Sequence, residues 1–171
     1  MDLRLEFETI LRDYGHPVLL IRQNKTVRCT DYNEMYQSSD KQCPICLGLG
    51  YLFSIEKHIC RSQVAAIPET LPRMKTSITA GELAIDSKMF FLKYDVRPSK
   101  DDLIVECSWD GAKPIIDEYS ALYEINYPQP YRGAGGEVIY FRTACKSDPV
   151  EATLRLSTIA GTQYMAIDRG D

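Results

Sequence analysis

The chain has 171 residues, of which 44% are hydrophobic and 26% are charged, a composition that favours a globular protein over a disordered one. Residues 1–66 carry eight basic and eight acidic side chains, and residues 67–171 carry twelve and sixteen, so the net charge is −4. Neither half has the basic excess that binding to a phosphate backbone requires, and no apolar run approaches the ~18 residues of a transmembrane helix. We therefore expect no sequence-specific nucleic-acid partner and no membrane partner. The acidic N-terminal residues also predict no secretion signal.

The N-terminal region predicts one helix followed by a β-hairpin. Apolar side chains at helical spacing over residues 2–13 predict a short amphipathic helix. Residues 17–22 and 26–29 are rich in β-forming side chains, and the turn-like residues 23–25 between them predict the hairpin. Residues 30–42 are polar and predict a loop.

A further strand and then a change in composition follow this loop. Residues 51–56 alternate between apolar and polar side chains, and we expect this strand to continue through His58 and Cys60. Two prolines shortly afterwards mark a shift in composition. We therefore predict two regions, a helix plus a zinc-binding lobe over residues 1–66 and a β-domain over residues 67–171.

The second region predicts strands and turns without a convincing helical period. Its predicted strands lie within residues 84–96, 102–109, 119–127, 137–145 and 151–158. Turn-forming dipeptides, prolines and a glycine run separate them. Short strands at intervals of roughly 8–20 residues are typical of a small antiparallel barrel or sandwich. The predicted fold class is therefore mainly β (α+β), with one helix and a hairpin in the N-terminal lobe.

Cysteine spacing gives the clearest indication of a site. Four of the six cysteines, Cys29, Cys43, Cys46 and Cys60, fall within 32 consecutive residues. In a protein without a predicted secretion signal, the expected compartment is reducing, and clustered thiols there predict a metal site rather than disulfides. Zinc prefers thiolate ligands in tetrahedral structural sites, and a Cys-x-x-Cys turn brings two sulfurs to one ion. We predict one structural zinc per chain, bound by these four residues.

The identity of the fourth ligand is less well determined than the Cys43–Cys46 pair. The spacing Cys-x13-Cys-x2-Cys-x13-Cys contains one Cys-x-x-Cys turn, at Cys43–Cys46, which we call the knuckle. Standard zinc fingers and ribbons contain two such ligand pairs. His58 is an alternative to Cys60, because residues two apart on a strand point to the same side. Asp31 is a weaker third candidate.

The cysteines also allow other interpretations. They could be unrelated buried residues, since free cysteine is often buried. A redox dithiol is possible on the Cys-x-x-Cys spacing, although redox pairs sit at a helix N-terminus and this motif precedes a strand. A catalytic zinc would need an open position and a general base, and only Glu56 suggests itself. Cys107 and Cys145 each sit in a predicted strand and are interpreted as small core residues.

The remaining residues do not assemble an enzyme active site. The chain has two histidines, and no nucleophile, base and orienting group can be combined from the sequence. The run from Gly133 to Gly136 lacks the Lys-Ser/Thr of a phosphate-binding loop. We therefore expect a non-enzymatic protein.

Two family resemblances support this interpretation. The string Cys43-Pro-Ile-Cys46-Leu-Gly48-Leu-Gly50 resembles one Cys-x-x-Cys-x-Gly-x-Gly unit of the zinc domain of DnaJ-type chaperones, which implies only a local zinc knuckle. The order of parts resembles the head–tail connector or stopper (neck) virion proteins of tailed bacteriophages. The parts are a short helix, a hairpin ending in Arg28-Cys29, the knuckle followed by a tyrosine, and a β-barrel carrying residues 95–98 and 102–106. That family's pattern would place another cysteine soon after Arg28-Cys29, where this chain has Asp31.

The neck resemblance implies a structural role in the virion. Copies would assemble in the host cytoplasm as a ring that contacts portal or adaptor proteins on one side and tail proteins on the other. The ring would join head to tail and help to retain packaged DNA, which passes through its lumen. The alternative is a zinc-stabilised adaptor module that binds proteins in a cellular complex.

Overall fold

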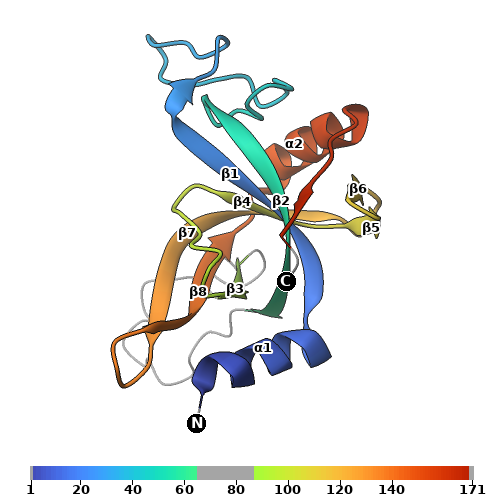
Figure 1. Cartoon of the computed structure of the whole chain (residues 1–171). Coiled ribbons are helices and arrows are strands. Elements are labelled where there is room, and N and C mark those ends of the chain that lie inside the picture. The colour runs from blue at the N-terminus through green and yellow to red at the C-terminus, as the bar shows by residue number, and fades with distance from the viewer. Residues whose placement is uncertain (1, 65–86, 170–171) are drawn as a thin grey trace, which may run out of the picture.

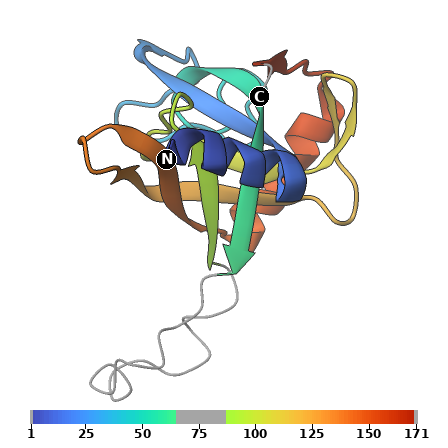
Figure 2. The same cartoon turned by 60° about the horizontal axis from the view of Figure 1, so that its bottom comes forward.

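The computed structural model describes residues 2–64 and 87–169, which form a closed six-stranded antiparallel barrel with two helices (Figures 1 and 2). The barrel strands follow one another in the order β1-β4-β7-β8-β3-β2, and pairing of β1 with β2 closes the ring. The mainly β fold predicted from sequence is confirmed. The strands are β1 (His16–Arg28), β2 (Tyr51–Val64), β3 (Ser87–Lys93), β4 (Leu103–Glu106), β7 (Ala121–Arg132) and β8 (Val138–Lys146).

Alternation along the strands separates an inner core from an outer one. Val18 and Leu20 belong to a buried cluster to which all six barrel strands contribute, so this cluster fills the barrel interior. Leu19 and Ile21 point the other way, into a cluster that includes Ala152 of helix α2 (Pro149–Gly161). The outer cluster also contacts the small hairpin of β5 (Ser108–Asp110) and β6 (Lys113–Ile115). Cys145 is buried inside the barrel and Cys107 packs against the outer cluster, as expected for core residues.

Helix α1 (Leu3–Tyr14) forms where the apolar period predicted it. Asp2 caps it by accepting a hydrogen bond from the Arg4 N–H. The helix lies over the barrel strands (Figure 2), and its Phe7 and Leu11 pack on residues of these strands. Neither α1 nor α2 has the length and apolarity that crossing a bilayer needs, and no other helix occurs in the described ranges.

The strand predicted over residues 151–158 was wrong, because this segment forms helix α2. Asp148 caps the helix by accepting from the N–H groups of Val150 and Glu151, and a proline occupies its first turn. The residues that face the barrel recur at helical spacing, and they are Ala152, Leu156 and Ile159. The alternation of leucines in the same segment mimicked a strand.

The hairpin predicted within residues 17–29 was also wrong. Residues 23–25 do not turn the chain, because β1 runs unbroken alongside β2 from the His16–Cys60 pair to the Asn24–Leu52 pair. A register shift between Asn24 and Arg28 absorbs the turn-like residues as an irregularity in the ladder. The true connection between the two strands is residues 29–50, which carry the knuckle.

Strand β7 extends beyond its predicted end at Pro128. β7 pairs with β4 only as far as Glu124, and its later residues pair with β8 alone among the barrel strands. Proline has no backbone N–H, so Pro128 and Pro130 are tolerated in this part of the strand, where one edge needs no donors. The predicted glycine-rich loop then connects β7 to β8.

The predicted boundary between residues 66 and 67 lies outside the described residues. Strands from both of the predicted regions build the barrel, since β1 and β2 precede this point and the other four follow it.

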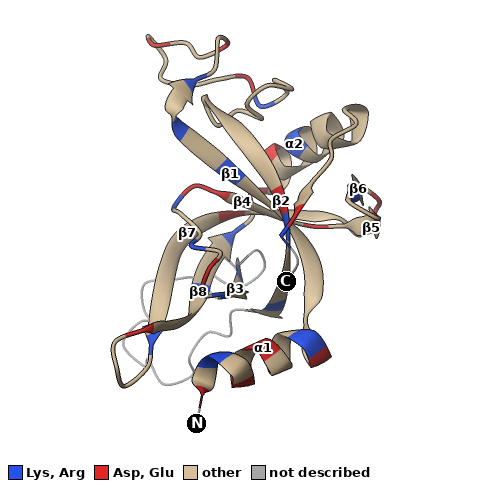
Figure 3. Cartoon of the chain, in the orientation of Figure 1, with Lys and Arg blue, Asp and Glu red and all other residues tan. Residues whose placement is uncertain are grey.

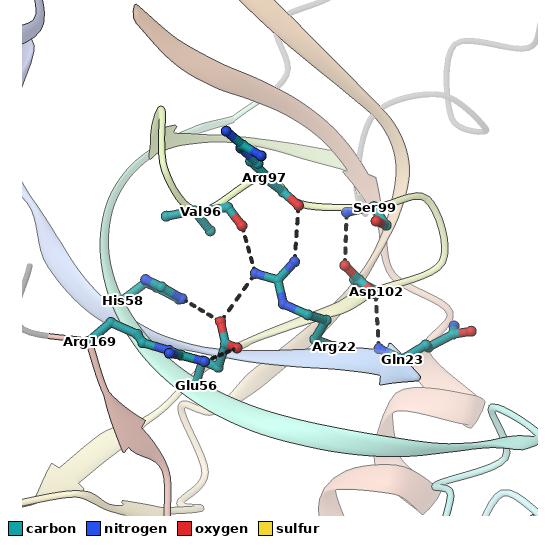
Figure 4. A network of polar contacts seen from close by, with 9 residues as sticks. All are labelled: Arg22, Gln23, Glu56, His58, Val96, Arg97, Ser99, Asp102 and Arg169. Atoms are coloured by element: carbon teal, nitrogen blue, oxygen red, sulfur yellow. Dashed lines mark hydrogen bonds and ion pairs between the residues drawn. The ribbon is translucent and has the colours of Figure 1, made fainter. Parts of the chain in front are cut away.

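A buried carboxylate fastens the C-terminal strand β9 (Ile167–Asp168) to the barrel (Figure 4). Glu56 accepts hydrogen bonds from Arg22 at 3.1 Å and Arg169 at 2.9 Å, and His58 Nε2 lies 2.9 Å from it. Burial alone would raise the pKa of Glu56, but these three partners outweigh it and lower the pKa to about 2. Arg22 also donates to the carbonyls of Val96 and the following residue, and so ties β1 to the turn after β3.

We predict that Glu56→Gln lowers the free energy of unfolding by about 3 kcal/mol at pH 7, because the change leaves Arg22 without its charged partner. The carboxylate contributes stability above its ordinary pKa of 4.5, and this contribution is lost as the pH falls towards about 2. The difference between wild type and variant should therefore shrink on acidification, as measured by urea unfolding at pH 7 and pH 3. The exposed Glu118→Gln variant is the control, and an equal loss in both variants would contradict the assignment.

Candidate metal centre

Three cysteines meet at the end of the arm that β1 and β2 form beyond the barrel (Figure 1). Cys29 follows the last residue of β1, and its N–H donates to the carbonyl of Gly50 at 3.0 Å, just before β2 begins. Cys43 and Cys46 lie in the connecting loop. This arrangement brings the first cysteine opposite the knuckle, as the sequence predicted.

The knuckle is a tight turn that directs backbone N–H groups at sulfur. The N–H groups of Gly48 and Gly50 are hydrogen-bonded to the Cys46 sulfur, and those of Ile45 and Cys46 to the Cys43 sulfur. Gly48 and Gly50 adopt φ values of +75° and +80°, a region that favours glycine. A Cβ at Gly48 would also lie 2.6 Å from the side chain of Lys41. The two cysteines and two glycines of the Cys-x-x-Cys-x-Gly-x-Gly motif are therefore the residues that this turn requires.

The separation of the sulfurs fits a tetrahedral metal ion. The three Sγ atoms all lie within 4.8 Å of one another, and those of Cys29 and Cys43 are 3.9 Å apart. Zinc–sulfur bonds of about 2.3 Å in a tetrahedron place sulfurs about 3.8 Å apart. A disulfide would need about 2.05 Å, and all three residues are free thiols in this structure. Cys29, Cys43 and Cys46 could thus hold one metal ion.

The turn changes the acidity of two of these thiols in opposite directions. Burial raises the pKa of Cys43 to about 11 against the effect of its N–H donors. Burial also acts to raise the pKa of Cys46, but the N–H groups of Gly50 and Gly48 and the neighbouring thiols outweigh it, so its pKa falls below the ordinary value. Such N–H donors stabilise thiolate, which is the form that binds a metal.

The fourth ligand predicted from the sequence is not brought to this cluster. Cys60 is buried in the barrel interior, where its sulfur lies 3.7 Å from His16 Nε2. His58 faces the same interior and contacts Glu56. Asp31 lies in the arm loop, where its carboxylate accepts from the Asp40 N–H at 3.2 Å.

The length of β2 explains this correction. The spacing argument treated the thirteen residues between Cys46 and Cys60 as a loop that could fold back. Most of them form an extended strand that starts at Tyr51, and nine residues of strand place Cys60 about 30 Å from the knuckle.

Helix α2 supports the knuckle from the side, which the sequence did not reveal. The buried Arg155 donates through Nε to the carbonyl of Leu47 at 2.8 Å, and Lys41 forms a 3.1 Å ion pair with Glu151. The hydroxyl of Tyr164, just after the helix, donates to the carbonyl of Pro44. Because this segment was predicted as a strand, its contacts with the knuckle could not be anticipated.

A second polar cluster lies inside the barrel, towards the end where β1 starts. Glu106 accepts from Lys88 at 2.6 Å and lies 3.0 Å from His16, which in turn contacts Cys60. Burial raises the pKa of Cys60 far above its ordinary value. A fully buried thiol of this kind is not poised as a nucleophile.

Comparison with known proteins does not assign a family. No protein-family model matches the sequence, and no curated protein matches it. The interpretation of the site therefore rests on its geometry.

We predict that Cys46→Ser abolishes metal binding and loosens residues 29–50, because the metal would be the staple that joins Cys29 to the knuckle. The matched variant Cys60→Ser should keep one metal ion per chain. Native mass spectrometry gives the metal content, and hydrogen exchange should show loss of protection in the arm while β3, β4, β7 and β8 stay protected. If folded Cys60→Ser lost the metal and Cys46→Ser retained it, the three-cysteine site would be wrong.

Proposed function

We propose that this chain is a structural protein of a bacteriophage neck, in which copies form a ring that joins head to tail and helps to retain packaged DNA. The observation that carries the proposal is an arm held together by a cysteine cluster that projects from a closed barrel. This arrangement agrees with the parts on which the sequence resemblance rests, with the hairpin replaced by the long β1–β2 pair.

We infer that the metal is zinc and that its role is structural. Cys29, Cys43 and Cys46 form a small buried cluster of their own at the arm, and the next residue, Leu47, is buried in the outer cluster that also contains Ala152 of α2. Three buried thiols add little apolar packing to the loop around them, so a bound metal would act as its staple, and thiolates select zinc among the common structural metals.

A non-enzymatic role is consistent with how the barrel is filled. Large side chains such as Phe90, Leu92 and Ile104 occupy its interior and are fully buried. A barrel of this size leaves no room for a substrate when side chains fill it. The polar groups that lie inside it are engaged with one another, as Glu56 and Glu106 show.

Two exposed apolar surfaces, separated by much of the length of β2, suit head-to-tail assembly. The arm surface consists of Met35, Tyr36 and Ile45, which are 84%, 73% and 49% exposed. The helix surface lies on α1 and includes Leu5, which is 60% exposed and lines a groove of about 720 Å³. A ring requires two different surfaces that meet between neighbours, whereas a twofold dimer requires one. Methionine and tyrosine are also enriched at protein interfaces.

The distribution of charge suits a conduit whose wall does not bind the DNA backbone. Figure 3 shows Lys and Arg interspersed with Asp and Glu along α1 and the strands, rather than gathered in one stripe. Phosphate-backbone binding depends on such basic stripes.

The alternative function is a zinc-stabilised adaptor that binds proteins in a cellular complex. The arm surface favours it as well, because an exposed methionine and tyrosine would serve any protein partner. Gene neighbourhood separates the two proposals, since a neck protein is expected beside portal, capsid and tail genes.

Ring assembly predicts a specific complementation between two variants. Leu5→Glu should block the helix surface, and Met35→Glu should block the arm surface, so each variant alone should sediment as a monomer. An equimolar mixture should form a 1:1 dimer, because each variant keeps the surface that the other lacks. Sedimentation velocity of wild type, both variants and the exposed control Tyr119→Glu measures this. A wild type that stays monomeric at high concentration, or a mixture that stays monomeric, would contradict assembly through these surfaces.

A further inference from the structure

We propose that zinc bound by Cys29, Cys43 and Cys46 keeps a water molecule as its fourth ligand, and that this water exchanges for a small thiolate or imidazole ligand. The inference rests on the proposed binding of zinc, and it changes the predicted closed four-cysteine site into an open one.

The other three cysteines and both histidines of this chain are engaged in contacts away from the three sulfurs. All six cysteines and both histidines lie within residues 2–64 and 87–169, and the rest of the sequence contains neither type. Cys60 and Cys145 are buried inside the barrel, and Cys107 packs beside α2. His16 contacts Glu106 and His58 contacts Glu56. A fourth sulfur or nitrogen ligand would therefore have to come from outside the chain.

The nearby carboxylate is already engaged in holding the arm loop. Asp31 Oδ2 accepts from the Asp40 N–H, and the Asp40 carbonyl accepts from the Cys43 N–H at 3.1 Å. This chain of bonds fixes the loop that leads to the knuckle. No Asp or Glu of the described residues joins the three sulfurs in the group whose ligand atoms lie within 4.8 Å of one another. With carboxylates of the described residues outside this group, the proposed site has water in its fourth position.

The exposure of the three cysteines indicates on which side solvent can enter. Cys46 is fully buried, whereas Cys29 and Cys43 retain 4% and 7% exposure, and the neighbouring Ile45 is half-exposed. Of the three ligands, Cys43 therefore has the most exposed surface, and we expect an added ligand to enter on its side. A three-thiolate zinc complex with water has charge −1 (+2 from zinc and −3 from sulfur), and the N–H donors from Ile45, Cys46, Gly48 and Gly50 suit such an anion.

Cobalt substitution tests the inference, because Co²⁺ reports both the number of thiolates and exchange at the open position. The Co²⁺ protein should show about three quarters of the sulfur-to-metal charge-transfer intensity of a four-thiolate reference. X-ray absorption of the zinc protein should show three sulfurs and one light atom at about 2.0 Å. Titration with imidazole, and separately with a small thiol, should shift the d–d bands to saturation. The shift should be the same in Asp31→Asn and in the control Glu34→Gln.

Each other outcome overturns the open site in a distinct way. Bands that do not move with either added ligand would mean a closed site. A spectrum altered by Asp31→Asn before any ligand is added would assign the fourth position to that carboxylate. A spectrum that changes on dilution from oligomer to monomer would assign it to a neighbouring copy. Failure to bind zinc or cobalt at all would instead refute the metal in the proposed function, which the initial stoichiometry measurement shows before any titration.

Discussion

The rest of the structure depends on the long antiparallel ladder between β1 and β2. Its part nearest His16 closes the barrel, because β1 also pairs with β4 and β2 also pairs with β3. Its distal part leaves the barrel and becomes the arm, where each strand has lost its second neighbour among the barrel strands. A two-stranded ribbon is only marginally stable by itself in water. The arm therefore needs other sources of stability, and these are its contacts with α2 and the cysteine cluster at its end.

Local patterns in the sequence predicted what local chemistry determines. Helix α1 follows from an apolar period and a cap within a few residues, and the knuckle follows from two cysteines and two glycines in one turn. The prediction of a small antiparallel barrel or sandwich follows from short alternating strands separated by turns. None of these features depends on which distant segment lies alongside, so a single sequence is sufficient to recognise them.

The errors occurred where distant partners decide the outcome. Residues 23–25 are turn-like by composition, but pairing with β2 holds them in an extended strand. The leucines near residue 155 fit both a strand and a helix, and the cap at Asp148 and the outer face of the barrel select the helix. Cys60 has ligand chemistry, but the strand that carries it runs away from the knuckle into the barrel. The same spacing would have suited a loop that turned back.

The C-terminal segment contacts both the knuckle and the barrel. Arg155 and Tyr164 hold the knuckle, and Arg169 binds Glu56 where β9 pairs with β2. The segment thus spans the base of the arm and is anchored both to the knuckle loop and to the barrel. An arm braced in this way would present its surface at a fixed angle to the barrel, as the proposed ring would require, since small angular errors would prevent closure. The cysteine cluster and the Glu56 network thus lie at the two ends of this segment, and a metal held by the three cysteines would fix the end at the knuckle.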